Sequence, residues 1–191
     1  WQALALRPPA PTAALLTDVG NDLLYGSPAP TIAGWVEECL ARLRDAGARV
    51  AMTPLPLCSI GALPPSRYVL LRGILFPGCR LSLAAVMEQA FDLDRRLRAL
   101  AKGYGAALAE HRPAWYGFDP IHIRRRCYPA AWREILAPWS DAPAPALARA
   151  SLRRWLRLRL LGADRRWVFG RERRTAQPAG RLPDGTVIGL Y

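Results

Sequence analysis

The sequence predicts an α/β protein with a parallel sheet. Two short apolar segments, Ala13–Thr17 and Arg49–Thr53, each fit a strand, and an amphipathic stretch lies between them. Strand, helix and strand at this spacing form a βαβ unit, whose two strands are parallel. The chain has 191 residues, 51% of them apolar, which suits one domain with its own core. We expect this domain to span residues 1–138 and a small basic appendage to span 139–191.

The first strand is short, apolar and bounded by turn residues, which is typical of a strand buried on both faces. Thr31–Ala46 then predicts a helix that ends at Gly47. Its apolar stripe consists of Trp35, Val36, Cys39, Leu40 and Leu43. Arg49–Thr53 follows as a second buried strand.

The middle of the chain predicts a loop, two helices and a third strand. Four prolines make residues 54–66 a loop, and Ser66–Leu75 fits a short helix. Ser82 is the expected N-cap of the clearest helix. Its apolar positions alternate between spacings of three and four: Leu83, Val86, Ala90, Leu93, Leu97 and Leu100. Ala106–Glu110 is a weaker, alanine-rich third strand.

The C-terminal part predicts a basic appendage. Tyr128–Leu136 fits a short helix and Ser140–Pro145 a linker, while Trp167–Gly170 and a turn at residues 183–185 indicate a small β structure. Residues 111–191 carry 16 Lys or Arg against 6 Asp or Glu, whereas residues 1–110 carry 11 against 9. Leu147–Leu161 is a basic amphipathic helix. The sequence favours a helix packed on the domain with its arginines outward, and the alternative is contact with an anionic membrane surface or nucleic acid.

Several protein classes do not fit this composition. No run of about 18 uncharged apolar residues exists, so no transmembrane helix is expected. The first residues lack the basic and apolar regions of a signal peptide, which slightly favours the cytoplasm although an upstream signal would not be visible. The four cysteines are widely spaced, without a zinc-binding pattern, and fit buried free thiols. We expect no metal and no cofactor.

Asp119 and His122 are the first candidates for chemistry. A histidine becomes a general base when a carboxylate holds its Nδ1–H and leaves Nε2 free. A separation of three residues in a loop allows that contact, and Pro120 stiffens the loop. The alternative is a surface acid beside a structural histidine.

Asn21 is the second candidate, because it follows the first strand. Ligands of open α/β sheets bind at the carboxyl ends of the strands. A side-chain amide there can donate a hydrogen bond to a developing oxyanion. The alternative is that Gly20, Asn21 and Asp22 only form a turn.

Taken together, Gly20-Asn21-Asp22 and Asp119-Pro-Ile-His122 resemble the third and fifth conserved blocks of the SGNH (GDSL-type) serine hydrolases. The resemblance covers residues 13–137 and implies a flavodoxin-like three-layer fold with a parallel sheet. It implies that His122 activates a serine, that Asp119 orients His122, and that Asn21 donates to the oxyanion. Gly20 and Asp22 would support the loop.

The sequence departs from that family in two respects. Val19 stands where the third block begins with glycine, and Gly20 is expected to supply the tight turn instead. The Gly-Asp-Ser block with the nucleophile is absent, as is the glycine that completes the oxyanion hole. We expect the nucleophile upstream of Trp1, with a strand and helix that complete the sheet. Of the serines present, Ser59 is the nearest to a substitute.

The resulting hypothesis is a serine esterase acting on an acyl or acetyl ester of a small molecule, lipid or carbohydrate, present here without its nucleophile. The rival hypothesis is a non-catalytic α/β binding module that uses its arginine-rich C-terminus on a membrane or nucleic acid.

Overall fold

The computed structural model describes residues 1, 10–139, 151–183 and 185–191. The chain divides into two compact units, Trp1–Ala146 and Leu147–Tyr191. The predicted linker Ser140–Pro145 lies outside the described residues, so each unit is described by itself.

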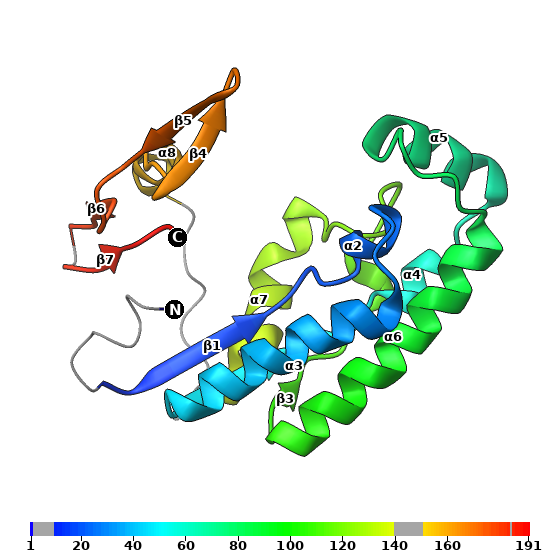
Figure 1. Ribbon diagram of the computed structural model, residues 1–191, viewed down its shortest axis with the longest axis horizontal. Helices are drawn as coiled ribbons and strands as arrows, with labels where there is room; N and C mark the ends of the chain where they lie inside the picture. The colour runs from blue at the N-terminus through cyan, green and yellow to red at the C-terminus, as the bar shows by residue number, and fades with distance from the viewer. Residues whose placement is uncertain (2–9, 140–150, 184) are drawn as a thin grey trace. The chain divides into compact units, whose positions relative to one another are not determined.

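The first unit is an α/β structure built on a parallel sheet (Figure 1). Its strands are β1 (Thr12–Leu16), β2 (Ala48–Met52) and β3 (Ala107–Leu108), in the order β1-β2-β3. β1 pairs with β2 over five positions, whereas β3 pairs with β2 at only two. The strand predicted at Ala106–Glu110 is therefore much shorter than expected.

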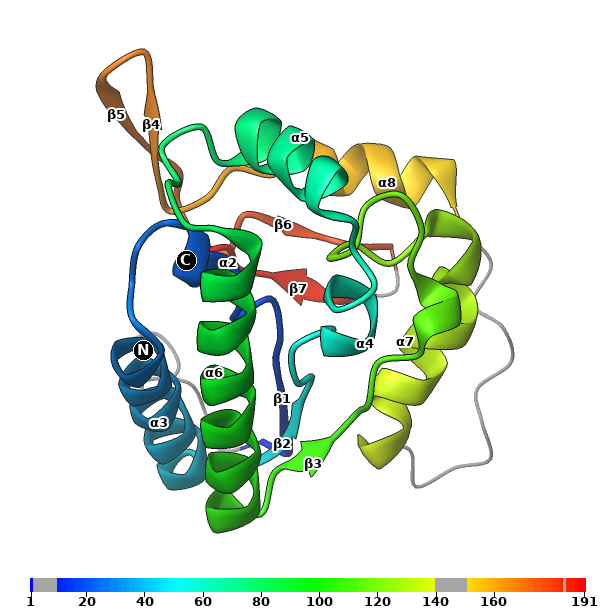
Figure 2. The same cartoon turned by 90° about the vertical axis from the view of Figure 1, so that its right-hand side faces the viewer.

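Helices cover both faces of this sheet (Figure 2). α3 (Ala29–Asp45) and α6 (Leu83–Tyr104) pack together on one face, where Leu16 and Met52 join their core. α7 (Tyr128–Leu136) covers the other face, and Leu15 packs on that side with its residues. Leu15 and Leu16 thus point to opposite faces, as successive strand residues do.

The N-cap of the long helix is Ser82, as the sequence predicts. The Ser82 hydroxyl accepts a hydrogen bond from the Ala85 N–H at 3.2 Å, and α6 ends at Gly105, whose φ of 66° favours glycine. In α3 the prediction is partly wrong. Val36, Leu40 and Leu43 are buried, but Trp35 lies at the edge of the stripe and is 49% exposed.

The prediction that β1 is buried on both faces is wrong. None of its residues is fully buried and Ala13 is exposed, whereas Ala51 and Met52 of β2 are completely buried. β2 lies between two strands, while β1 pairs on one side only among the described residues. Local apolarity identified the strand but not its position at the edge.

The segment between β2 and α6 is more helical than predicted. It contains α4 (Leu57–Ile60), within the predicted loop, and α5 (Pro65–Leu75), which matches the predicted helix. A single turn, α2 (Asn21–Leu24), follows β1. Three 3-10 turns complete the unit: Pro113–Trp115, Arg125–Cys127 and Ala137–Trp139.

The second unit contains a helix and two β hairpins. α8 (Leu152–Arg159) forms part of the helix predicted at 147–161, of which 147–150 lie outside the described residues. β4 (Arg165–Val168) pairs with β5 (Arg171–Arg174), and β6 (Gly180–Arg181) with β7 (Val187–Ile188). Among the described helices, none has the length and apolarity to cross a membrane.

All four cysteines are free, but only Cys79 is buried. Cys58 is exposed, and Cys39 and Cys127 are partly exposed. The expectation of four buried thiols is therefore wrong for three of them.

Candidate functional site

Asp119 and His122 are in direct contact. The Nδ1 atom of His122 lies 2.6 Å from Oδ2 of Asp119, and the other carboxylate oxygen accepts the backbone N–H groups of Ile121 and His122 at 3.0 and 3.2 Å. Because the carboxylate can only accept, Nδ1 carries a proton, and in the neutral imidazole Nε2 then has the free lone pair. Nε2 has no hydrogen-bond partner among the described residues, and the His122 side chain is 63% exposed.

The carboxyl of Asp119 is held in its ionised form. Partial burial alone would raise its pKa, but the hydrogen bonds from Ile121 and His122 outweigh this effect and keep the pKa below its ordinary value. The acid can therefore orient the imidazole and stabilise a positive charge on it.

The loop that carries this pair is fixed at two points. Pro120 is buried, so the residue between the acid and the histidine anchors the turn. Arg67 of α5 donates to the carbonyls of Gly117 and Phe118 at 3.5 and 3.4 Å, and its guanidinium lies over the Phe118 ring. α5 is thus joined directly to the loop.

The loop after β1 places Asn21 at the start of α2. Asn21 is partly buried, and its side-chain amide makes no hydrogen bond to any residue in the described part of the chain. Asp22 lies in the first turn of α2, where its carbonyl accepts the N–H of Ser27 at 3.0 Å.

The left-handed residue before α2 is Asp18, not Gly20. Gly20 has helical angles, with φ −75° and ψ −18°, which any residue can adopt. Asp18 has a φ of 60°, a conformation that aspartate tolerates better than most residues. The backbone angles at position 20 therefore do not require glycine, and the supporting role expected for Gly20 in this loop stays a prediction.

The two loops meet at one pocket of about 100 Å³. The β1 loop contributes Asp18, Gly20 and Asn21, and the other loop contributes Pro120 and Ile121, the residues between Asp119 and His122. The rest of the lining is largely aliphatic or aromatic and comes from α2, α4, α5, α6 and their connections: Leu23, Leu24, Leu55, Pro56, Ile60, Leu63, Tyr68, Leu71, Arg72, Leu75, Phe76, Val86 and Ala90.

The polar ends of two lining residues are turned to the protein backbone. The Tyr68 hydroxyl and the Arg72 guanidinium each donate to the carbonyl of Leu81 at 2.8 Å. These contacts leave mostly hydrocarbon for the pocket wall, so the pocket suits an apolar group.

No serine among the described residues lines this pocket. Ser59 lies in α4 between Cys58 and Ile60, and only Ile60 contributes to the lining. Ser82 is occupied as the cap of α6. The candidate base, acid and amide are therefore not joined at this pocket by a serine from the described residues.

His111 is a second histidine near the sheet edge that sequence reasoning did not consider. Its Nε2 donates to the Pro54 carbonyl at 2.8 Å, so its Nδ1 accepts from the Tyr116 hydroxyl at 2.6 Å. Burial lowers the pKa of His111 and raises that of Tyr116, so both groups stay neutral. With both ring nitrogens engaged, His111 is structural; its position just after the third strand was the available signal.

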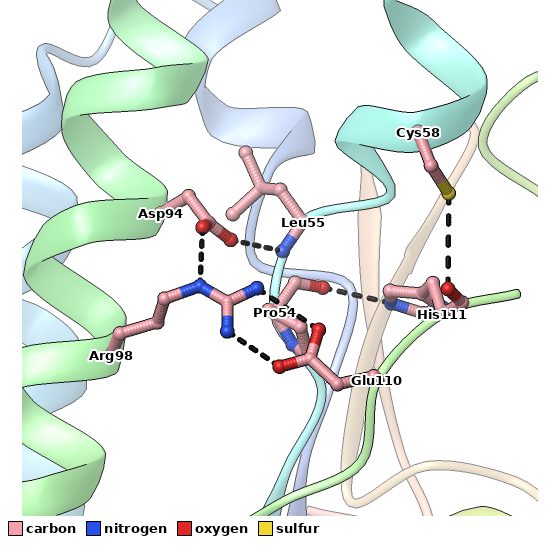
Figure 3. Close-up of polar contacts among 7 residues, drawn as sticks. All are labelled: Pro54, Leu55, Cys58, Asp94, Arg98, Glu110 and His111. Atoms are coloured by element: carbon pink, nitrogen blue, oxygen red, sulfur yellow. Dashed lines mark hydrogen bonds and ion pairs between the residues drawn. The ribbon is translucent and has the colours of Figure 1, made fainter.

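A buried carboxylate connects the segments that follow β2 and β3 (Figure 3). Asp94 of α6 accepts the Leu55 N–H at 3.0 Å and the Arg98 Nε–H at 2.6 Å. Arg98 in turn holds both oxygens of Glu110, which follows β3. Leu55 lines the pocket, so this network fixes one wall of it to α6.

The described residues contain no group of three or more His, Cys, Asp or Glu that could hold a metal ion. The chemistry available at the site is proton transfer at His122 Nε2 and hydrogen-bond donation from Asn21. No protein-family model matches the chain. A search of curated proteins likewise finds no relative.

Proposed function

We propose that this chain carries the base and oxyanion side of a serine ester hydrolase of the SGNH class. The observation that carries the proposal is the shared pocket: Asn21 and the residues between Asp119 and His122 line one apolar cavity. Two loops about a hundred residues apart in sequence thus reach one pocket, although Asp119 and His122 themselves are not among its lining residues.

Each polar group has one role in the proposed reaction. A serine Oγ attacks the ester carbonyl carbon, and His122 Nε2 takes the hydroxyl proton. Asp119 keeps His122 in the required tautomer and stabilises the imidazolium. The Asn21 amide donates to the oxyanion as the carbonyl oxygen becomes negative. His122 then protonates the leaving alkoxide, and water releases the acyl group by the reverse sequence.

The pocket indicates which part of the ester it holds. Its wall is hydrocarbon, and the polar ends of Tyr68 and Arg72 are directed to the Leu81 carbonyl. Transfer of an acyl chain from water to such a wall is favourable, because it buries apolar surface. A sugar would instead lose its hydrogen bonds to water there. We propose that the acyl group of the substrate occupies it.

The serine is proposed to come from a strand that pairs with the free edge of β1. The described residues place no strand on that edge, although β1 carries the Asn21 loop at its end. A further parallel strand there would end beside the same loop. With its helix it would give the flavodoxin-like three-layer architecture, in which β1, β2 and β3 are three consecutive strands.

The rival proposal, a non-catalytic binding module, draws support from the arginine-rich second unit. It predicts that the gene product binds an anionic surface and hydrolyses no ester.

The proposed oxyanion role is tested with the gene product expressed from its own start codon and assayed on p-nitrophenyl esters. Asn21→Ala should lower kcat about 10²- to 10³-fold and change KM little, because the amide donates mainly to the transition state. Asp45→Asn, on the exposed end of α3, is the control. Unchanged kcat in the Asn21 variant would remove the amide from the mechanism.

A further inference from the structure

The β4–β5 hairpin of the second unit has two faces with different electrostatics. The register places Arg165 opposite Arg174 and Arg166 opposite Arg173. Residues directly opposite share a face, and like charges in such pairs repel each other. Two neighbouring rows of the same hairpin thus bring arginines together.

On one face of the hairpin acidic side chains offset the repulsion between the arginines, and on the other face they do not. Glu172 pairs with Arg174 at 3.0 Å and approaches Arg165 to 4.0 Å, while Asp164 lies 3.8 Å from Arg165. On the opposite face Arg166, Arg171 and Arg173 are all exposed, and none has an acidic partner among the described residues. The only other residue of that face is Val168.

The hairpin tip adds an exposed aromatic ring in an unfavourable conformation. Phe169 has a φ of 50°, followed by Gly170 at 74°, so the two-residue turn requires left-handed angles at both positions. Asparagine is preferred at the first of these positions, and a bulky residue there is strained. Phe169 is also fully exposed, and Trp167 in the preceding strand is 72% exposed. An apolar environment around the ring would offset the cost of its exposure.

α8 has the same combination of side chains. Leu152, Trp155 and Leu156, with Leu160 just after the helix, are all at least 48% exposed, and arginines lie among them. Nucleic acids offer phosphates for arginine and bases for aromatic rings, but no environment for leucine. An anionic bilayer offers phosphates and hydrocarbon together.

We propose that the second unit binds anionic phospholipid membranes, with the Arg166–Arg171–Arg173 face at the lipid phosphates and Phe169 inserted below them. Arginine binds phosphate oxygens through paired N–H groups, so the face supplies both charge and geometry. This inference is independent of the proposed hydrolase activity.

Two matched double variants of the full chain test the charge requirement. Arg166→Gln with Arg173→Gln removes one cross-strand pair, and Arg165→Gln with Arg174→Gln removes the adjacent pair on the compensated face. Both lose the same net charge from the same hairpin. Binding to vesicles of phosphatidylcholine mixed with phosphatidylglycerol is measured by co-sedimentation, with pure phosphatidylcholine vesicles in parallel.

The first variant should bind the anionic vesicles about thirty-fold more weakly than the unmodified chain, and the second should bind much nearer to normal. Added salt should reduce binding of the unmodified chain, and neutral vesicles should retain little protein. Equal losses in the two variants, or equal binding to neutral vesicles, would overturn the proposal. Binding to a single-stranded oligonucleotide with the same face dependence, without vesicle binding, would also overturn it.

Phe169→Asn separates membrane insertion from hairpin stability. Asparagine suits the left-handed turn, so the melting temperature should hold or rise. Vesicle binding should nevertheless weaken about tenfold or more, because the ring that would insert into the bilayer is lost. Unchanged vesicle binding would exclude insertion of Phe169.

Discussion

His122 has a ring nitrogen without a hydrogen-bond partner among the described residues, whereas His111 has none. Nε2 of His122 is free of hydrogen bonds among the described residues, whereas both ring nitrogens of His111 are engaged by Pro54 and Tyr116. A general base needs an unprotonated nitrogen that faces the reacting group. This distinction decides which of the two histidines in the chain can act.

Asp119→Asn tests the orienting carboxylate. An amide can donate to Nδ1 and favour the wrong tautomer, so kcat of the gene product should fall by a factor of about 10² to 10⁴. The variant should also respond differently to acid. Because the folded-state pKa of Asp119 is depressed, its ionised form contributes stability above a pH of about 4, and this is lost as the pH falls through the folded pKa.

Denaturant unfolding at several pH values measures that second effect. The difference in unfolding free energy between the unmodified protein and Asp119→Asn should be present near neutrality and shrink below a pH of about 4. A difference that grows in acid would contradict the geometry at Asp119.

At the scale of elements, α6 holds the end of β2 in place. Asp94 is only 6% exposed, and it links α6 to the Leu55 backbone and, through Arg98, to Glu110 after β3. The pocket wall near Leu55 thus depends on a helix that contributes only two of its lining residues.

Asp94→Ala should destabilise the protein by about 2–3 kcal/mol, because it leaves the buried Leu55 N–H and Arg98 without their acceptor. Asp92→Ala is the matched control on the same helix. Its ion pairs with Arg95 and Arg96 lie at the surface, and its effect should be much smaller. Chemical denaturation measures both; equal effects would mean that the buried network adds nothing.

Much of this architecture could be predicted from periodicity and capping residues. The spacing of Val86, Ala90, Leu93 and Leu97, with Ser82 as cap, predicts α6 because helix geometry depends on local sequence. Asp94 could have been found in the same pattern, since it is four residues after Ala90 and three before Leu97. Acids are normally expected at the surface, so the pattern alone did not mark Asp94 as buried.

Other features depend on contacts distant in sequence and could not be predicted in that way. β1 is exposed because, in the described part of the chain, it pairs with a strand on one side only. A pattern of neighbouring residues does not show which strands pair. Spacing suggested the Asp119–His122 contact, but the pocket that Asn21 lines depends on how four helices and two loops pack. The positive φ of Asp18 also lacks a signal as strong as a glycine would give.

At the scale of the whole molecule, the edge of β1 that pairs with no strand in the described part of the chain should govern solution behaviour. An unpaired strand edge beside apolar side chains is a template for association with other chains. We expect residues 1–191 expressed alone to self-associate or to melt over a broad temperature range, as sedimentation and calorimetry would show. A sharp two-state melt of a monomer would argue against a missing strand at this edge.

His122, the proposed general base, is the residue whose loss should affect hydrolysis most directly. With the gene product expressed from its own start codon and p-nitrophenyl octanoate as substrate, the unmodified protein should release p-nitrophenol. His122→Ala should reduce kcat by a factor of about 10² to 10⁴ with little change in the melting temperature. His111→Gln, the control at the other histidine, should lower stability while folded molecules keep their turnover. Absence of hydrolysis by the unmodified protein, or full turnover in His122→Ala, would contradict the proposed site.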